Sequence, residues 1–132
     1  MGRAATIVLP LAAALALLSG AALAQNEVDP DEARLAFNNH CRTCHVTNEG
    51  DHRLGPSLHG VVGREAGSAS GFPYSSAMQN ADFVWDEERL DRFIENPEAV
   101  VPGNNMKPFS GIASAEERAK VIAHLKAESE GQ

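Results

Sequence analysis

The sequence has few aromatic residues and almost no cysteine, and it lacks the alternating apolar pattern that is typical of β-strands. Five phenylalanines, one tryptophan and one tyrosine are the only aromatic residues among 132. A small chain with so little large apolar volume can bury only a limited core by itself. Basic residues are also in the minority, with 11 lysines and arginines against 18 acidic residues and a formal net charge of −7. This balance argues against nucleic acid or an anionic membrane surface as a partner.

The N-terminus predicts an exported protein. Arg3 precedes an apolar run over residues 4–18, and residues 22–24 (Ala-Leu-Ala) have the A-x-A form of a cleavage site. The run is too short for a comfortable membrane span, and an uncleaved anchor is the alternative. We therefore expect a signal peptide over residues 1–24, a single domain over residues 25–132, and no stable membrane insertion after cleavage.

The two cysteines lie together in the motif Cys41-Arg42-Thr43-Cys44-His45, which has the C-x-x-C-H spacing of covalent haem attachment. At this spacing each thiol can form a thioether with a haem vinyl group, and the histidine that follows can bind the iron. A thioredoxin-like redox pair would require a βαβ context, and a zinc site would require two more ligands at short spacing. The sequence offers neither, so the motif predicts one covalently attached haem c with its iron.

Helix-capping patterns predict an all-α domain. Asp29, followed by Pro at the first helical position, predicts a helix over about residues 30–41. Asp86 predicts a second helix over about residues 87–95, and Ser114 opens the last one. The haem motif therefore lies at the end of the first helix.

The connections between these helices are expected to be short helical turns and long loops. One turn is expected over residues 98–101, before Pro102-Gly103. From residue 46 to residue 80 the chain is rich in glycine, serine and other polar residues. A loop of this length in a small domain needs a surface to pack on, and a haem would provide it.

A six-coordinate electron-transfer haem needs a second axial ligand from methionine or histidine. Met106 lies in a loop flanked by prolines, where an unbranched thioether could reach over a flat ring. Its alternative role is that of a gap-filling core methionine, and the surrounding turn residues favour the ligand. The other candidates are Met78, in a polar helical turn, and four histidines for which packing, hydrogen-bonding or surface roles are expected: His40, His52, His59 and His124.

Beyond the C-x-x-C-H motif, the chain resembles the small soluble class I cytochromes c of the mitochondrial and purple-bacterial type, over about residues 31–126. The resemblance implies a cytochrome c fold, with three main helices, short helical turns and long loops wrapped around one haem. It also implies a periplasmic one-electron carrier, not an enzyme, whose iron alternates between Fe(III) and Fe(II) with His/Met ligation. The segments that carry it are residues 54–64 (LGPSLHGVVGR), 71–75 (GFPYS), 83–85 (FVW) and 95–97 (ENP), leading to Pro102-Gly103 and Met106.

The resemblance also implies roles for individual residues. Cys41 and Cys44 would hold the haem, with His45 as proximal and Met106 as distal ligand. The carbonyl of Pro56 would accept the other ring N–H of His45 and so fix its tautomer. Buried haem propionates need donors, and the implied set is Arg64, Tyr74 and Trp85.

Several positions depart from the family pattern, among them Ala33 in the first helix, where glycine is usual, and Met78, where asparagine is usual. Phe93 stands where many members carry a tyrosine near the methionine sulfur, and His124 replaces the usual aromatic residue of the last helix. Pro108 is an extra residue between Met106 and Phe109, which leaves open whether Phe109 is the aromatic lid beside the haem edge.

The partners expected for such a carrier are redox proteins such as a cytochrome c reductase, an oxidase, a reaction centre or a periplasmic dehydrogenase. They would meet a monomer at the exposed haem edge through a small interface, with Arg42, Arg53 and Lys107 as steering charges. Two alternatives remain: an enzyme or gas sensor with an open sixth position, and a haem-bearing subunit of a larger dehydrogenase or oxidase.

Overall fold

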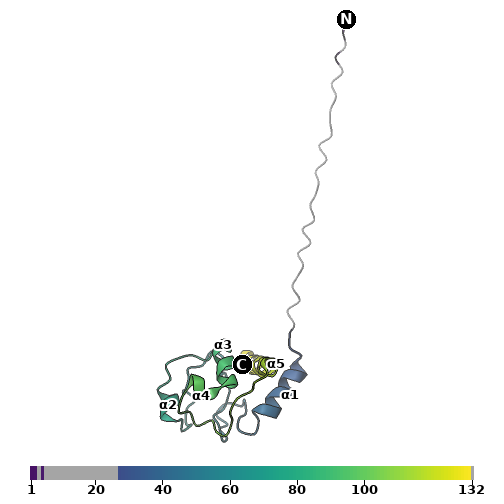
Figure 1. Ribbon diagram of the computed structural model, residues 1–132. Coiled ribbons are helices and arrows are strands. Elements are labelled where there is room, and N and C mark those ends of the chain that lie inside the picture. Colours follow the sequence, from purple (N-terminus) through teal and green to yellow (C-terminus); the bar gives the residue numbers. More distant parts are fainter. Residues whose placement is uncertain (3, 5–26, 132) are drawn as a thin grey trace.

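The computed structural model describes residues 1–2, 4 and 27–131, and residues 27–131 form an all-α domain (Figure 1). The expected signal peptide lies almost wholly outside the described residues. Among the residues that are described, no helix is both long and apolar enough to span a bilayer. The helices are α1 (Pro30–His40), α2 (Ser76–Gln79), α3 (Glu87–Glu95), α4 (Pro97–Val100) and α5 (Ala115–Glu130).

The three main helices begin where their capping residues predict. The Asp29 carboxylate accepts the backbone N–H groups of Asp31 and Glu32 at 2.9 and 3.2 Å. Asp86 and Ser114 each accept the N–H group three residues further on, at 2.7 and 3.2 Å. Each cap satisfies an amide that has no partner inside its helix, an effect of about 1 kcal/mol. The all-α fold with long loops is therefore confirmed, and α1 ends one residue earlier than expected.

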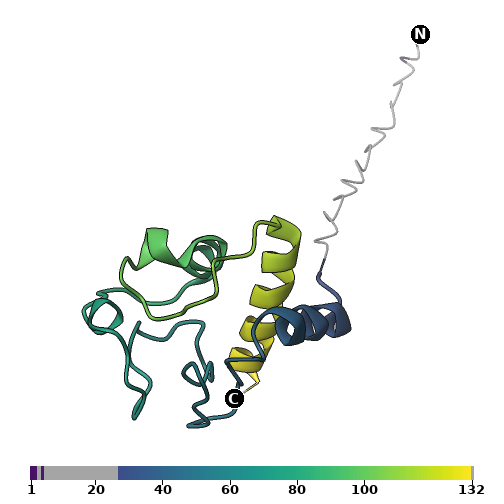
Figure 2. The ribbon, with the colours of Figure 1, turned by 60° about the horizontal axis from the view of Figure 1, so that its bottom comes forward.

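α1 crosses α5, and this crossing brings the two ends of the domain together (Figure 2). The rings of Phe37 and His124 meet there with their centroids 4.7 Å apart. Leu125 lies beside them in the core with 3% of its surface exposed. At the rim of the crossing, His40 Nε2 lies 3.2 Å from a carboxylate oxygen of Glu117. The packing role expected for His124 agrees with these contacts, whereas His40 is exposed and contacts a carboxylate.

The structure predicts that His124 makes the α1–α5 crossing sensitive to acid. Burial lowers the pKa of His124, the Glu128 carboxylate opposes this shift, and Arg34 adds to it. A histidine whose pKa is lower in the folded state stabilises the fold above its usual pKa of about 6.5, and that contribution is lost as the pH falls through the folded pKa. Unfolding by denaturant at about pH 7 and about pH 5 measures the loss. His124→Phe should reduce it, and an equal loss in both proteins would show that another group is responsible.

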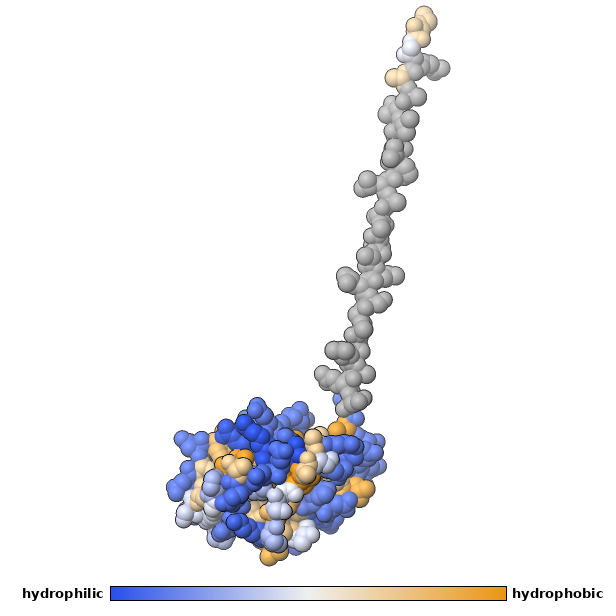
Figure 3. Space-filling view, in the orientation of Figure 1, coloured by the Kyte–Doolittle hydropathy of each residue, from blue (hydrophilic) through white to orange (hydrophobic). Residues whose placement is uncertain are grey.

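The buried core contains residues of all three main helices and of the long loop between α1 and α2. α3 packs on both α5 and α4, and Val121 of α5 is completely buried. On the surface, Figure 3 shows hydrophilic residues over most of the visible face, with apolar residues in small separate groups. The buried apolar cluster consists of Ala36, Phe37, Val61, Ala66, Trp85, Leu90, Phe93, Ile94, Val101, Ile112, Val121, Ile122 and Leu125.

Candidate functional site

The C-x-x-C-H motif forms a tight turn at the end of α1. Cys41 is the C-cap of this helix, and its N–H group donates to Phe37 O at 2.8 Å. The N–H groups of Cys44 and His45 both donate to Cys41 O, at 3.0 and 2.9 Å. Neither cysteine is in a disulfide. The turn therefore holds two thiols and the His45 imidazole close together in one short segment.

The surroundings of the thiols do not favour a zinc site. Burial, with a smaller contribution from the neighbouring Cys44, raises the pKa of Cys41 to about 12. Burial of this kind is typical of a thiol that is not activated as a thiolate. Within residues 27–131, no group of three or more His, Cys, Asp and Glu side chains is arranged to hold a metal ion.

His45 is buried and its ring is oriented by a single hydrogen bond. Its Nδ1–H group donates to Pro56 O at 2.8 Å, which leaves Nε2 as the nitrogen available to a metal. Burial lowers the pKa of His45, the bond to Pro56 opposes the shift, and Arg64 adds to it. The ring is therefore neutral at neutral pH, as metal ligation requires. A Cβ atom at Gly55 would overlap this ring, so the loop can approach His45 only with glycine there.

Arg64 and Trp85 are brought side by side by two backbone segments that pair without forming a regular sheet. Trp85 N–H donates to Arg64 O at 2.8 Å, and Gly63 N–H donates to Trp85 O at 2.7 Å. The segments meet in an isolated antiparallel bridge between Glu65 and Val84. Two of the three residues implied as propionate donors therefore lie next to each other, although they are far apart in the sequence.

The Arg64 side chain is half-buried, with part of its hydrogen-bonding capacity unused. One terminal nitrogen donates to Ser57 O and His59 O, at 3.0 and 2.7 Å. Its Nε–H group is buried without any partner, and no ion pair joins Arg64 to another described residue. Burial lowers the pKa of Arg64, and nearby Tyr74 partly opposes the shift. A buried N–H group without a partner is costly, and a haem propionate would satisfy it. The residues present therefore fit a haem.

Tyr74 and Trp85 are held in place by their neighbours. The Tyr74 hydroxyl accepts the N–H group of Ala69 at 3.1 Å, which leaves its own hydrogen free to donate. Trp85 has 6% of its surface exposed and packs edge-on against Phe83 and Phe93, at centroid distances of 4.8 and 4.9 Å. These aromatic contacts fix the indole plane before any ligand binds.

Met106 is half-buried against the apolar cluster and its loop is organised by Asn104. Asn104 Oδ1 accepts the Met106 N–H at 2.9 Å, and its Nδ2 donates to Val101 O at 2.9 Å. Asn104 is 4% exposed, so it is one of the few buried polar side chains among the described residues. The tendency of asparagine to bond the backbone two residues on could have revealed this role in the sequence. The other methionine considered, Met78, lies half-buried in α2.

Arg118 is a second buried polar residue that sequence reasoning missed. Its Nε donates to an Asp91 carboxylate oxygen at 2.8 Å. One terminal nitrogen donates to Ile112 O and Ala113 O, both at 2.9 Å. Arg118 thus fastens the chain that follows the Met106 loop to α3 and α5. An arginine after two glutamates on an amphipathic helix gives no indication of such burial.

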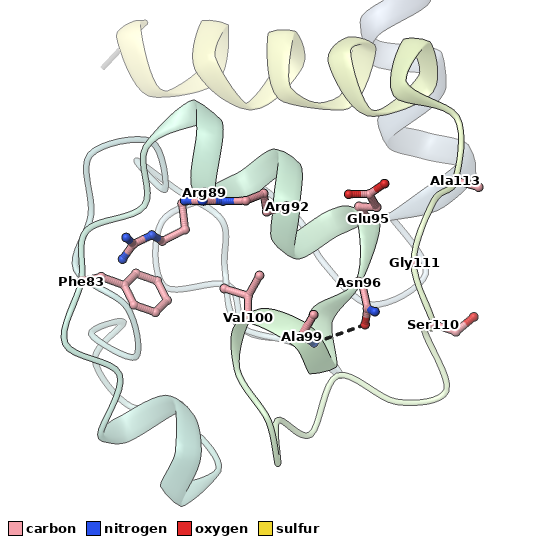
Figure 4. A pocket seen from close by; sticks show the side chains of 10 residues that line it. All are labelled: Phe83, Arg89, Arg92, Glu95, Asn96, Ala99, Val100, Ser110, Gly111 and Ala113. Carbon is pink, nitrogen blue, oxygen red and sulfur yellow. Dashed lines mark hydrogen bonds between the residues drawn. The ribbon is translucent and has the colours of Figure 1, made fainter.

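An open groove of about 850 Å³ lies beside α3 and α4, and none of the predicted site residues lines it (Figure 4). The Arg89 guanidinium lies 4.3 Å from the centre of the Phe83 ring in this groove. Next to it, the Asn96 side chain accepts the N–H group of Ala99 at 3.3 Å and is the N-cap of α4. The groove is lined by Phe83, Arg89, Arg92, Glu95, Asn96, Ala99, Val100, Ser110, Gly111 and Ala113.

Comparison with known proteins gives consistent results. The model of the cytochrome c family matches residues 31–128. Cytochrome c of Euglena viridis is 39% identical over 98 residues, which cover 74% of this chain and 95% of that protein. Cytochrome c2 of Rhodomicrobium vannielii is 45% identical over 98 residues, covering 74% of this chain and 77% of that protein. The solved structure of cytochrome cH from Methylobacterium extorquens has a TM-score of 0.68 at 35% identity and covers 76% of this chain and 99% of its own.

Proposed function

Because the chain belongs to the cytochrome c family and carries covalently attached haem c, we propose that it is a soluble periplasmic one-electron carrier and not an enzyme. The observation that best supports this function is the state of His45. It is a buried and neutral imidazole with Nδ1 committed to Pro56, so Nε2 can bind iron. When bound, haem c supplies an iron that takes up and releases one electron.

The protein's own residues would attach, ligate and orient this group. Cys41 and Cys44 would hold the ring by thioethers, and His45 and Met106 would be the iron ligands. A thioether ligand favours the ferrous state and raises the reduction potential relative to a second histidine. The turn at the end of α1 and the bond to Pro56 keep the proximal side fixed during electron transfer.

Arg64, Tyr74 and Trp85 would form the wall that holds the haem propionates. The unpartnered Nε–H group of Arg64 and the free hydroxyl hydrogen of Tyr74 are donors suited to carboxylates. Because these side chains are already packed, little rearrangement should accompany a change of oxidation state.

Carbon monoxide distinguishes this carrier from a gas sensor or a haem enzyme with an open sixth position. If Met106 occupies that position, the ferrous protein should show no change in its visible spectrum under carbon monoxide at neutral pH. A rapid shift on exposure to the gas would instead indicate an open or easily vacated site.

Apparent mass in a native periplasmic extract would separate a free monomer from a subunit of a larger dehydrogenase or oxidase.

Partners would dock at the haem edge near Phe109, which is half-buried. Two of the three proposed steering charges are already paired: Arg53 donates twice to Asp51, at 2.6 and 2.8 Å, and Lys107 lies 3.6 Å from Glu98. Arg42 is exposed and makes no ion pair with the described residues, so it should contribute most to steering. Suitable partners are a cytochrome c reductase, an oxidase, a reaction centre or a periplasmic dehydrogenase.

A further inference from the structure

Glu98, on the short helix α4, directs its carboxylate at the loop that carries Met106. One carboxylate oxygen accepts the Gly103 N–H at 2.9 Å. The other accepts Asn104 Nδ2 at 3.2 Å. Gly103 has a φ of +84°, a conformation that favours glycine and turns its amide within reach of the carboxylate. A single carboxylate thus binds two successive residues of the loop.

Asn104 links the Glu98 carboxylate to the backbone of Met106. Asn104, which Glu98 contacts, accepts the Met106 N–H through its Oδ1 at 2.9 Å. Two hydrogen bonds therefore connect α4 to the amide of the proposed distal ligand. Asn104 is buried, so its bond to the Met106 amide is shielded from water, where hydrogen bonds are weaker.

The Glu98 carboxylate also lies beside Pro108, the extra residue of the loop. A small cavity of about 260 Å³ separates the start of α4 from residues 107–110, and Glu98, Lys107 and Pro108 are among its lining. Lys107 Nζ lies 3.6 Å from a Glu98 oxygen across this cavity. Both charged groups are more than half exposed, so the ion pair itself contributes little. The charge-assisted hydrogen bonds to Gly103 and Asn104 carry the interaction.

We propose that Glu98 is a positioning residue that holds the Met106 loop closed over the haem iron. This proposal rests on the His/Met ligation proposed above. Without the Glu98 carboxylate the loop opens more readily, and an added ligand displaces the thioether at lower concentration.

Imidazole titration of the ferric haem protein tests this role. Displacement of Met106 is followed through loss of the sulfur-to-iron charge-transfer band. The charge-assisted bonds of Glu98 form only when the loop is closed. Their loss in Glu98→Ala should therefore tighten apparent imidazole binding by about tenfold. Glu88→Ala is the matched control, since it removes an 81% exposed carboxylate that pairs with Arg92 on α3 and does not contact the loop. It should bind imidazole as the wild type does.

Amide hydrogen exchange supplies a readout that does not depend on the ligand. The Gly103 and Met106 amides should exchange faster in Glu98→Ala, and at the wild-type rate in Glu88→Ala. Unchanged imidazole affinity together with unchanged exchange would overturn the role of Glu98. A wild-type ferric protein without the charge-transfer band would contradict the ligation instead, and the exchange rates would still decide whether Glu98 holds the loop.

Discussion

Replacing Met106 with alanine is expected to abolish the sulfur-to-iron charge-transfer band of the ferric protein and to lower its reduction potential. The thioether stabilises the ferrous state, so its loss favours the ferric state. Axial ligands set haem potentials over a range of about 0.8 V, and we expect a fall on the order of 0.1 V or more. Visible spectra recorded during a potentiometric titration measure both effects in one sample.

Met78→Ala is the matched control for this experiment. Met78 is also half-buried and also contacts the apolar cluster, but it lies in α2. Its removal should leave the band and the potential close to those of the wild type, while costing some stability. If Met106→Ala retains the band and the high potential, Met106 is not the ligand and the distal assignment is wrong.

The second large effect is expected at Arg64. Replacing Arg64 with leucine removes the half-buried guanidinium of the proposed propionate wall, and would leave a carboxylate there without its cation. Breaking a buried charge pair from one side typically costs about 3–5 kcal/mol. We expect a loss of this size in the free energy of unfolding of the haem protein. Loss of a positive charge near the iron should also lower the reduction potential. A nearby cation destabilises the ferric state, so its removal favours that state.

Arg53→Leu separates this effect from the general loss of an arginine. Arg53 is exposed, and among the described residues it forms an ion pair only with Asp51, two positions earlier. Its replacement should change the free energy of unfolding by no more than about 0.5 kcal/mol. Similar losses from the two substitutions, measured by guanidinium unfolding of the ferric proteins, would show that Arg64 does not pair with a buried anion.

The features that were predicted from the sequence are those that depend on local chemistry. Asp29, Asp86 and Ser114 cap helices through amides within three residues, so helix starts follow from short segments. The turn at Cys41–His45 is likewise closed by bonds inside the motif. The family resemblance then supplied what spacing alone could not, such as the implied contact between His45 and Pro56, which are 11 residues apart.

The features that were missed depend on contacts between distant segments. Arg118 looks like a solvated helix residue in the sequence, and its burial follows from packing against residues 112–113 and α3. Pairing of the segments around Arg64 and Trp85 involves too few residues to produce an alternating pattern. The role of Glu98 depends on a turn at Gly103 whose geometry is set by the fold.

A redox titration of the wild-type protein with visible spectra is the decisive experiment for His/Met ligation. We expect a single one-electron transition of a covalently attached haem. We also expect a sulfur-to-iron charge-transfer band that is present in the ferric state and disappears on reduction. A ferric spectrum without that band, or one typical of a five-coordinate iron, would contradict a carrier in which His45 and Met106 close both faces of the ring.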